Sequence, residues 1–177
     1  FNALSGAGVT GTTYSDCTIT VTDSANNTSD SLSVSSFILD TTAPSLSEVT
    51  AVSTPTNDNT SSYTFSSNEA GTIAYAGSCS SSTTAASVGD NTITFNELAD
   101  GPYNCTITVT DNASNTSTQS VNTFIIDTTA PTLSRVTAVS SPINDSTPNY
   151  TFSSSEAGTI TYGGSCSSST TAASATN

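Results

Sequence analysis

The strongest constraint on the fold is an internal repeat, because one pentapeptide returns later in the chain. Asp-Thr-Thr-Ala-Pro occupies positions 40–44 and again 127–131, so the offset from 40 to 127 is 87 residues. Further landmarks keep this offset: Glu69/Glu156, Tyr63/Tyr150 and Cys79/Cys166. A constant period of this size is typical of tandem copies of one domain. Since proline cannot continue a sheet ladder, we predict that each pentapeptide is a joint between two domains.

The two joints divide the chain into three predicted domains. Residues 40–126 are a complete domain, residues 1–39 the C-terminal half of a domain, and residues 127–177 the N-terminal half of one. The halves are nearly complementary, because the last residue aligns near Asn91 and the first near Phe95. Two interpretations stay open: a window from a longer tandem array, or a subunit whose ends complete the next subunit by strand exchange.

Short strands are expected throughout residues 40–126, because apolar residues alternate with serine and threonine between turn signals. In the stretch Tyr103–Thr110, Cys105, Ile107 and Val109 share one side and threonines the other. The other expected strands are Ser45–Val52, Ser62–Ser66, Thr72–Cys79, Thr92–Phe95 and Gln119–Ile126. The pattern predicts an all-β fold of antiparallel sandwiches, one complete and two partial.

Charge and composition exclude several classes of function. The net charge is −13, and Arg135 is the single cation. One cation cannot form a phosphate-binding surface, so we expect neither nucleic acid nor an anionic membrane as a partner. No apolar run approaches membrane-spanning length, so we expect no membrane insertion in this segment. Without histidine or lysine, no serine has a base to activate it, and we do not expect an enzyme. Four cysteines at repeat positions favour an oxidising setting, extracellular or at the cell surface.

Three motifs together resemble the bacterial Ig-like domain, which occurs as tandem repeats in giant extracellular surface, adhesin and filament proteins. The motifs are Asp-Thr-Thr-Ala-Pro, Tyr-Thr-Phe-Ser-Ser-x-Glu-Ala-Gly-Thr-Ile and Cys-Thr-Ile-Thr-Val-Thr-Asp-x-Ala-x-Asn-x-Ser. The resemblance covers essentially the whole chain in three registers. It implies tandem immunoglobulin-like β-sandwiches in an extracellular array, often with calcium at the joints, and it implies no catalysis.

In this topology, the resemblance implies a disulfide between Cys79 and Cys105. The second strand carries no cysteine, so the bridge between sheets found in antibody domains is not available. Cys79 closes the expected strand Thr72–Cys79 and Cys105 lies near the start of the expected strand Tyr103–Thr110, which places both at one end of the sandwich. Cys17 and Cys166 lack partners in this chain, and we expect each to pair with a cysteine in an adjoining copy. Tyr103 lies where a tyrosine corner would lie, and an ordinary core tyrosine is the alternative.

Acids that recur in register are the candidate ligands of a metal ion. The same topology brings Asp40, Glu69 and Asp111 to one end of the complete domain, and Asn68, Asn112 and Asn115 would add neutral oxygens there. Oxygen ligands from loops are typical of calcium. The full candidate set is Asp40, Glu69, Asp111, Asp127, Glu156 and Asp23. The alternative is that these residues only form turns, because Asp and Asn cap turns through local hydrogen bonds.

Two functions fit these observations. The first is a structural repeat of an extracellular fibre, stalk or filament, with identical neighbouring domains or subunits as partners and calcium as the candidate cofactor. The alternative is an adhesin module that recognises a glycan, ice or a partner surface. The loops recur nearly unchanged between copies, which favours a spacer over a binding module.

Overall fold

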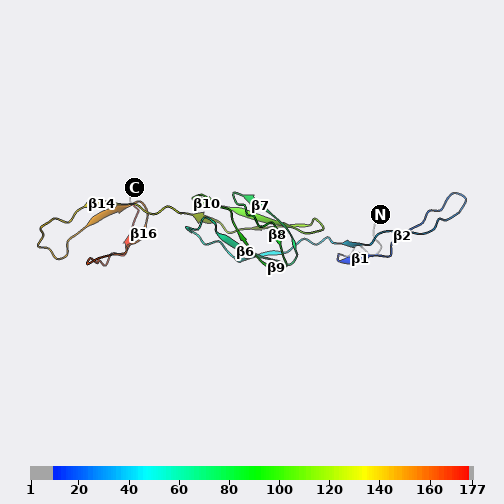
Figure 1. Cartoon of the computed structure of the whole chain (residues 1–177), viewed down its shortest axis with the longest axis horizontal. Helices are drawn as coiled ribbons and strands as arrows, with labels where there is room; N and C mark the ends of the chain where they lie inside the picture. Colours follow the sequence, from blue (N-terminus) through cyan, green and yellow to red (C-terminus); the bar gives the residue numbers. More distant parts are fainter. Residues whose placement is uncertain (1–9, 176–177) are drawn as a thin grey trace. The chain divides into compact units, whose positions relative to one another are not determined.

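The computed structural model describes residues 10–175, and positions 1–9 and 176–177 lie outside the described residues (Figure 1). The predicted segments 1–39 and 127–177 are therefore each described in part. Strands, turns and loops make up the described part of the chain. Among residues 10–175 there is no helix long and apolar enough to cross a membrane. The chain divides into two compact units, residues 1–127 and 128–177, and the division into three domains stays a prediction.

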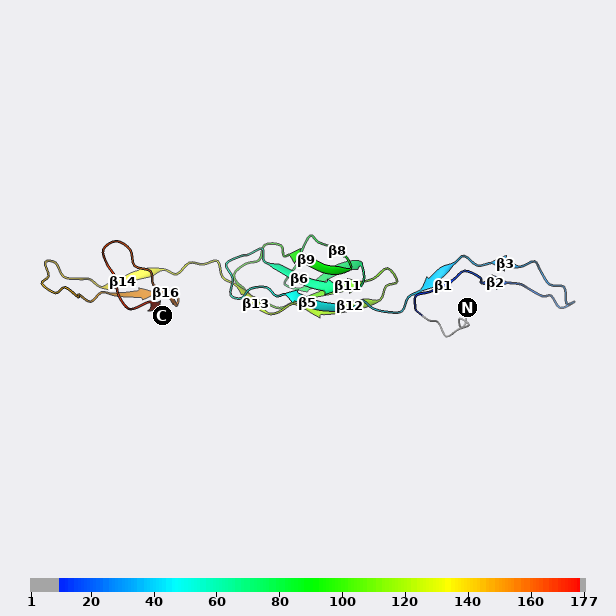
Figure 2. The same cartoon turned by 90° about the horizontal axis from the view of Figure 1, so that it is seen from below.

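Between Leu46 and Ile126 the chain forms two main antiparallel sheets and one separate strand pair (Figure 2). One sheet has the order β5-β6-β9, the other β12-β11-β7-β8, and β10 pairs with β13. The strands are β5 (Leu46–Thr50), β6 (Ser62–Ser67), β7 (Gly71–Gly77), β8 (Ala85–Ala86), β9 (Gly89–Thr94), β10 (Gly101–Tyr103), β11 (Cys105–Thr110), β12 (Thr116–Ser120) and β13 (Phe124–Ile126).

The core lies between these two sheets, because each sheet turns its apolar side inward. Strand β6 buries Tyr63 and Phe65, and β11 buries Ile107 and Val109, at spacings of two residues. All four belong to one hydrophobic cluster, to which β9 adds Ile93. In a β-sandwich, the inward side chains of two facing sheets form the core and alternate along each strand with outward side chains. The predicted all-β class and antiparallel sandwich are therefore confirmed.

The last two strands of the sandwich are each broken in two, which differs from the continuous strands Tyr103–Thr110 and Gln119–Ile126 expected above. Strand β10 pairs with β13, whereas β11 pairs with β7 and β12. The second break lies at Asn122, whose side chain accepts from the backbone N–H of Val52 over 2.8 Å and donates to its carbonyl over 2.9 Å. This side chain substitutes for a strand neighbour, so the ladder stops there.

The flanking segments repeat the pairings of the complete domain. Strand β1 pairs with β4 as β10 does with β13, and β2 pairs with β3 as β11 does with β12. In the second unit, β14 pairs with β15 as β5 does with β6, and β16 pairs with β17 as β7 does with β8. These strands are β1 (Thr12–Tyr14), β2 (Thr18–Ile19), β3 (Leu32–Ser33), β4 (Phe37–Leu39), β14 (Leu133–Thr137), β15 (Thr151–Ser154), β16 (Gly158–Thr159) and β17 (Ala172–Ala173).

Candidate metal centre

Three carboxylates from distant parts of the sequence meet at one end of the complete domain. Asp40 precedes β5, Glu69 lies in the turn between β6 and β7, and Asp111 follows β11. One carboxylate oxygen from each residue lies within 4.8 Å of the other two. Asp40 and Glu69 are half-buried and Asp111 is buried. The structure thus brings together the three acids that the sequence places at this end.

Asp111 begins the hairpin turn between β11 and β12 and organises it. Its Oδ1 accepts the backbone N–H groups of Ala113 and Asn115, both over 2.8 Å, and its Oδ2 accepts the Asn115 side-chain amide over 2.9 Å. The backbone N–H of Ser114 donates to the carbonyl of Asp111 over 3.3 Å, which closes a four-residue turn. Ser114, the fourth residue of this turn, has a left-handed backbone conformation with φ of 72°. A turn followed by a left-handed residue is a common hairpin connection.

These hydrogen bonds also set the ionisation of Asp111. The Asn115 side chain lowers the pKa of this carboxyl most. Burial, the second largest effect, raises the pKa, and the backbone N–H groups of Asn115, Ala113 and Ser114 lower it further. A carboxylate that accepts several hydrogen bonds favours its charged form. Asp111 is therefore held ionised, which is the state that a cation requires.

Asn115 and Asn68 connect the joint to the domain. The Asn115 side-chain amide donates to the carbonyl of Asp40 over 3.3 Å. The Asn68 side-chain oxygen accepts the backbone N–H of Ser45 over 2.6 Å, and the Asn68 N–H donates to the Ser45 carbonyl over 3.2 Å. The sequence analysis expected both amides to supply neutral ligand oxygens. The Asn68 oxygen is instead engaged with the backbone N–H of Ser45. The contact of Asn115 uses its amide nitrogen, so the ligand role of its oxygen stays a prediction.

Gly71 explains how Glu69 comes so close to Asp111. A Cβ atom at this position would lie 2.4 Å from the carbonyl oxygen of Thr110 and 2.9 Å from a methyl carbon of Val109. Only glycine permits this approach of β7 to β11. The turn that carries Glu69 is thereby pressed against the end of β11, one residue before Asp111.

The chemistry of this cluster fits a hard cation. Three like charges at these separations repel by ~3 kcal/mol per pair at an intermediate dielectric. Calcium takes six to eight oxygen ligands, several of them carboxylates from loops. An ionised carboxylate offers about four acceptor positions, and three at Asp111 already receive N–H groups. Asp40 and Glu69 therefore carry most of the remaining ligand capacity, and Asp111 contributes through Oδ2.

The other predicted acids occupy separate places. Asp23 caps its own turn as Asp111 does, with Ala25 N and Asn27 N over 2.9 Å each. The Asn27 side chain is the largest cause of its lowered pKa. Asp127 belongs to the first unit and Glu156 to the second, so the structure does not relate them. Within residues 10–175, Asp40, Glu69 and Asp111 are the acidic group of three that the structure brings together.

Asp58 and Asp145 occupy equivalent positions of two repeats, and each accepts hydrogen bonds within its own turn. Asp58 Oδ1 accepts Thr60 N over 2.9 Å and the Thr60 hydroxyl over 3.0 Å. Asp145 repeats this with Thr147, over 2.8 and 3.1 Å. At these two positions the turn-forming alternative describes the contacts fully.

The opposite end of the domain is closed by a disulfide and by aromatic packing. The structure joins Cys79 to Cys105, with a Cα–Cα distance of 5.8 Å, which is the pair implied by the resemblance. The Tyr103 hydroxyl donates to the carbonyl of Ala99 over 2.9 Å, the contact that defines a tyrosine corner. Cys17 and Cys166 are free cysteines here, so their pairing with other copies stays a prediction.

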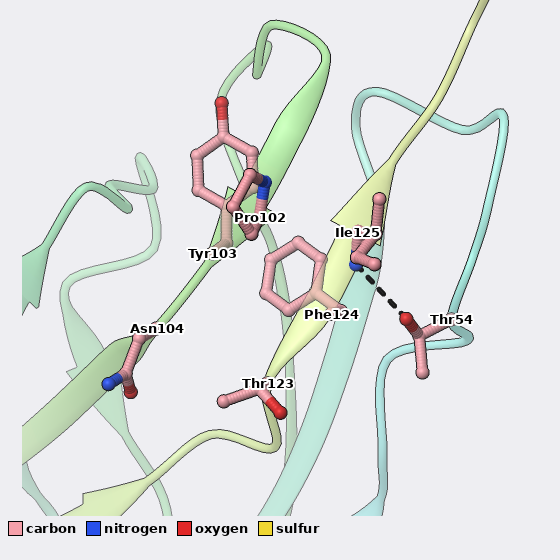
Figure 3. A pocket seen from close by; sticks show the side chains of 7 residues that line it. All are labelled: Thr54, Pro102, Tyr103, Asn104, Thr123, Phe124 and Ile125. Carbon is pink, nitrogen blue, oxygen red and sulfur yellow. Dashed lines mark hydrogen bonds between the residues drawn. The ribbon is translucent and has the colours of Figure 1, made fainter.

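A shallow pocket of about 500 Å³ lies beside this corner (Figure 3). The rings of Tyr103 and Phe124 stack with centroids 5.4 Å apart, and the Ile125 N–H donates to the Thr54 hydroxyl over 3.0 Å. Its lining residues are Thr54, Pro102, Tyr103, Asn104, Thr123, Phe124 and Ile125. None of these seven is an acid or a strong base, so the pocket offers no paired groups for proton transfer.

The Tyr63 hydroxyl is a feature that sequence reasoning missed. It is fully buried in the core, and among the described residues it has no hydrogen-bond partner of acceptable geometry. Burial, followed by the negative charge of Glu48, raises the pKa of Tyr63 to about 12. Alternation predicted that Tyr63 faces inward, but only the packed core decides whether its hydroxyl finds a partner.

Comparison with known proteins gives one family. Residues 42–128 match the model of the bacterial Ig-like domain family. Domains of this family are commonly extracellular and typically not enzymatic. No curated protein matches the chain.

Proposed function

We propose, because residues 42–128 are a bacterial Ig-like domain, that the chain is a structural repeat of an extracellular fibre, stalk or filament. Its mechanism is geometric: each sandwich adds length, and the joint between sandwiches sets the bending. Its partners are neighbouring domains or subunits of the same kind. The location outside the cell follows the common setting of the family and agrees with the buried disulfide, since disulfides persist in oxidising compartments.

One observation carries this proposal: the loops beside the joint bind the joint itself. The Asn115 side chain donates a hydrogen bond to the carbonyl of Asp40. Asn68 accepts the backbone N–H of Ser45 with its side-chain oxygen and donates its own backbone N–H to the Ser45 carbonyl. A linker fixed by hydrogen bonds to two loops has less freedom than a free tether, because each bond restricts backbone rotation. Such contacts are what a stiff spacer requires.

Calcium would stiffen the same joint. Asp40, Glu69 and Asp111 would hold the ion, and its charge would offset their mutual repulsion. Asp40 belongs to the linker and the other two acids to the domain, so one ion would connect the two. By repetition of the sequence alone, Asp127, Glu156 and Asp23 stay candidate calcium ligands.

The alternative function, an adhesin module, has less support. Some of the outward hydroxyl groups that a glycan or ice would contact are bonded to one another across the strands. The hydroxyl oxygens of Thr64 and Thr92 lie 2.9 Å apart, and those of Thr108 and Thr118 also lie 2.9 Å apart. Paired hydroxyls of this kind stabilise a sheet, and they have fewer free donors for a ligand.

Calcium titration of two matched variants tests the proposal. Glu69→Gln removes one charge from the acidic cluster, whereas Asp58→Asn removes one charge from the far end of the domain and keeps a residue able to cap the turn. At a calcium concentration 100 times the dissociation constant, wild type and Asp58→Asn should gain about 2.7 kcal/mol in unfolding free energy. Glu69→Gln should gain much less.

The mechanical part of the proposal is tested by small-angle X-ray scattering of the full chain with calcium and with a chelator. Stiffening predicts a narrower distribution of interdomain distances with calcium in wild type and Asp58→Asn, and no narrowing in Glu69→Gln. If calcium leaves the unfolding free energy of all three proteins unchanged, the proposal that calcium binds at the joint is wrong. A joint that bends freely in every condition would contradict the spacer function itself.

A further inference from the structure

Two segments near the beginning and the end of the complete domain lie side by side and run in the same direction. The first, residues 52–56, follows β5, and the second, residues 122–127, contains β13. A parallel bridge joins Thr56 to Ile126, whereas the neighbouring strand pairs β5–β6 and β10–β13 are antiparallel. We call this arrangement the parallel contact. It connects the segment that follows the first strand directly to the segment by which the chain leaves the domain.

Side-chain and backbone hydrogen bonds cross the parallel contact. Asn122 accepts the backbone N–H of Val52 over 2.8 Å and donates to its carbonyl over 2.9 Å. The Ile125 N–H donates to the Thr54 hydroxyl over 3.0 Å (Figure 3). The carbonyl of Ile125 accepts the backbone N–H of Thr56 over 3.0 Å. Bonds therefore follow one another along the whole length of residues 52–56.

A further bond reaches the second joint itself. The backbone N–H of Asp127, the first residue of the second pentapeptide, donates to the carbonyl of Thr56 over 2.9 Å. A pull on the two joints would draw β5 and residues 52–56 toward Asp40, and β13 toward Asp127. Because the segments are parallel, this pull would slide one along the other. The bonds lie across the direction of sliding, so the pull would load them together rather than one after another.

Both segments are also anchored in the core by apolar side chains. Val52 is 3% exposed, and Phe124 and Ile126 are each 1% exposed. All three belong to the hydrophobic cluster between the sheets. Sliding would move these side chains out of a close-packed interior and toward water, which is unfavourable. Hydrogen bonds and core packing therefore oppose the same movement.

We propose that the complete domain bears tension along the chain, and that the parallel contact is the element that resists it. This inference rests on the proposed function, because a repeat within a fibre is pulled through its two joints. It goes beyond that function, since resistance to bending depends on the contacts of the joint. Resistance to unfolding under tension depends instead on the bonds between residues 52–56 and 122–127.

The disulfide limits how far the domain extends once the parallel contact has yielded. Cys79 and Cys105 lie between the two segments in the sequence, so tension passes through their bond and not through the 26 residues that it closes off. At about 3.5 Å for each extended residue, opening the bond would release about 90 Å of chain in place of the 5.8 Å between the two Cα atoms. The two devices act in sequence: the contact resists unfolding, and the disulfide shortens the extension that follows.

Two asparagines offer a matched test of the parallel contact. Asn91 accepts the backbone N–H of Ser87 over 2.7 Å and donates to the Ser87 carbonyl over 2.8 Å, which is the same pair of bonds that Asn122 makes with Val52. It also donates to the carbonyl of Gly89 over 2.8 Å. Both asparagines are half-buried. The bonds of Asn91 stay within one turn, so they do not connect the two segments that tension would separate.

The first experiment pulls the full chain by its two ends in optical tweezers at constant force, with a chelator present so that calcium takes no part. Asn122→Ala should shorten the lifetime of the folded domain about tenfold or more, because it removes two bonds that resist sliding and forced unfolding follows the unfolding rate. Asn91→Ala should change this lifetime less than about twofold, although urea denaturation should show a comparable loss of stability. Equal shortening by both variants would overturn the proposal.

A smaller pair of changes serves if Asn122→Ala does not fold. Thr54→Val removes the hydroxyl that accepts the Ile125 N–H and keeps the shape of the side chain. Thr64→Val likewise removes one hydroxyl, from the pair that joins β6 to β9. Thr54→Val should shorten the lifetime under force more than Thr64→Val. The opposite order, or equal lifetimes, would overturn the proposal in the same way.

The second experiment compares the unfolding step of the wild type with and without a thiol reductant. Reduction should lengthen the step by about 85 Å, because the 26 residues closed off by the disulfide then extend as well. A step of unchanged length would show that the disulfide does not limit the extension. Scattering tests the joint without tension, and the tweezers test the sandwich under tension. A failure of the spacer function is therefore distinguishable from a failure of the parallel contact.

Discussion

The disulfide between Cys79 and Cys105 should supply a large part of the stability of the complete domain. It closes a loop with a sequence separation of 26 residues. Removing the closure entropy of a loop of that length from the unfolded state corresponds to about 3.5 kcal/mol at 25 °C. Because each 1.4 kcal/mol is a factor of ten in an equilibrium constant, replacing both cysteines with alanine should raise the unfolded fraction of the domain about 300-fold.

Hydrogen exchange followed by mass spectrometry measures this change within the full chain. The slowest amides of β7 and β11 report opening of the whole sandwich, so their protection should fall about 300-fold in the Cys79→Ala/Cys105→Ala variant. The matched control is Cys17→Ala/Cys166→Ala, which removes two cysteines that make no disulfide in this structure. That control should retain the protection of β7 and β11.

Two results would refute the reasoning. A fall of less than about tenfold in the cysteine-to-alanine variant would mean that loop closure contributes little, since about 2 kcal/mol of the expected effect would then be absent. An equal fall in the control would mean that the loss comes from removing cysteine side chains rather than from opening the loop. Chemical reduction of the wild type separates the bond from the side chains, because both sulfurs remain in place.

The further predictions concern three single side chains. Tyr63→Phe should stabilise the domain by about 1 kcal/mol in urea denaturation, because it removes a buried hydroxyl that lacks a partner; a destabilised variant would show that the hydroxyl is bonded. Since the folded pKa of Tyr63 is raised to about 12, the wild type should lose up to ~2.7 kcal/mol between pH 10 and pH 12, and Tyr63→Phe should not. Tyr103→Phe should lose about 1 kcal/mol by removing the bond to Ala99, and an unchanged urea midpoint would argue for an ordinary core tyrosine. The lowered pKa of Asp111 contributes stability at neutral pH that is lost as pH falls through the folded value; Asp111→Asn should therefore be less stable than wild type at pH 7, with a smaller difference at pH 3, and a difference that does not vary with pH would contradict the role of its charge.

Much of the fold was predictable, because the repeat and the period-two alternation are properties of the sequence itself. Cys105, Ile107 and Val109 alternate with threonines, and a strand with one buried face requires that pattern. Antiparallel topology then fixes which strand ends lie together. For this reason the convergence of Asp40, Glu69 and Asp111 could be expected from the order of the loops alone.

The tertiary structure decided what each polar side chain binds. Sequence reasoning assigned the Asn68 oxygen to a metal site, whereas this oxygen accepts the backbone N–H of Ser45. It did not foresee that the Asn115 amide nitrogen donates to the carbonyl of Asp40. It also expected continuous final strands, whereas Asn122 bonds to Val52 and interrupts one of them. A hydrogen bond between residues 70 positions apart depends on distances set by the whole packed sandwich. Alternation along a strand fixes the side on which a residue lies, but the partner that it meets there is fixed only when the sheets and loops close around it.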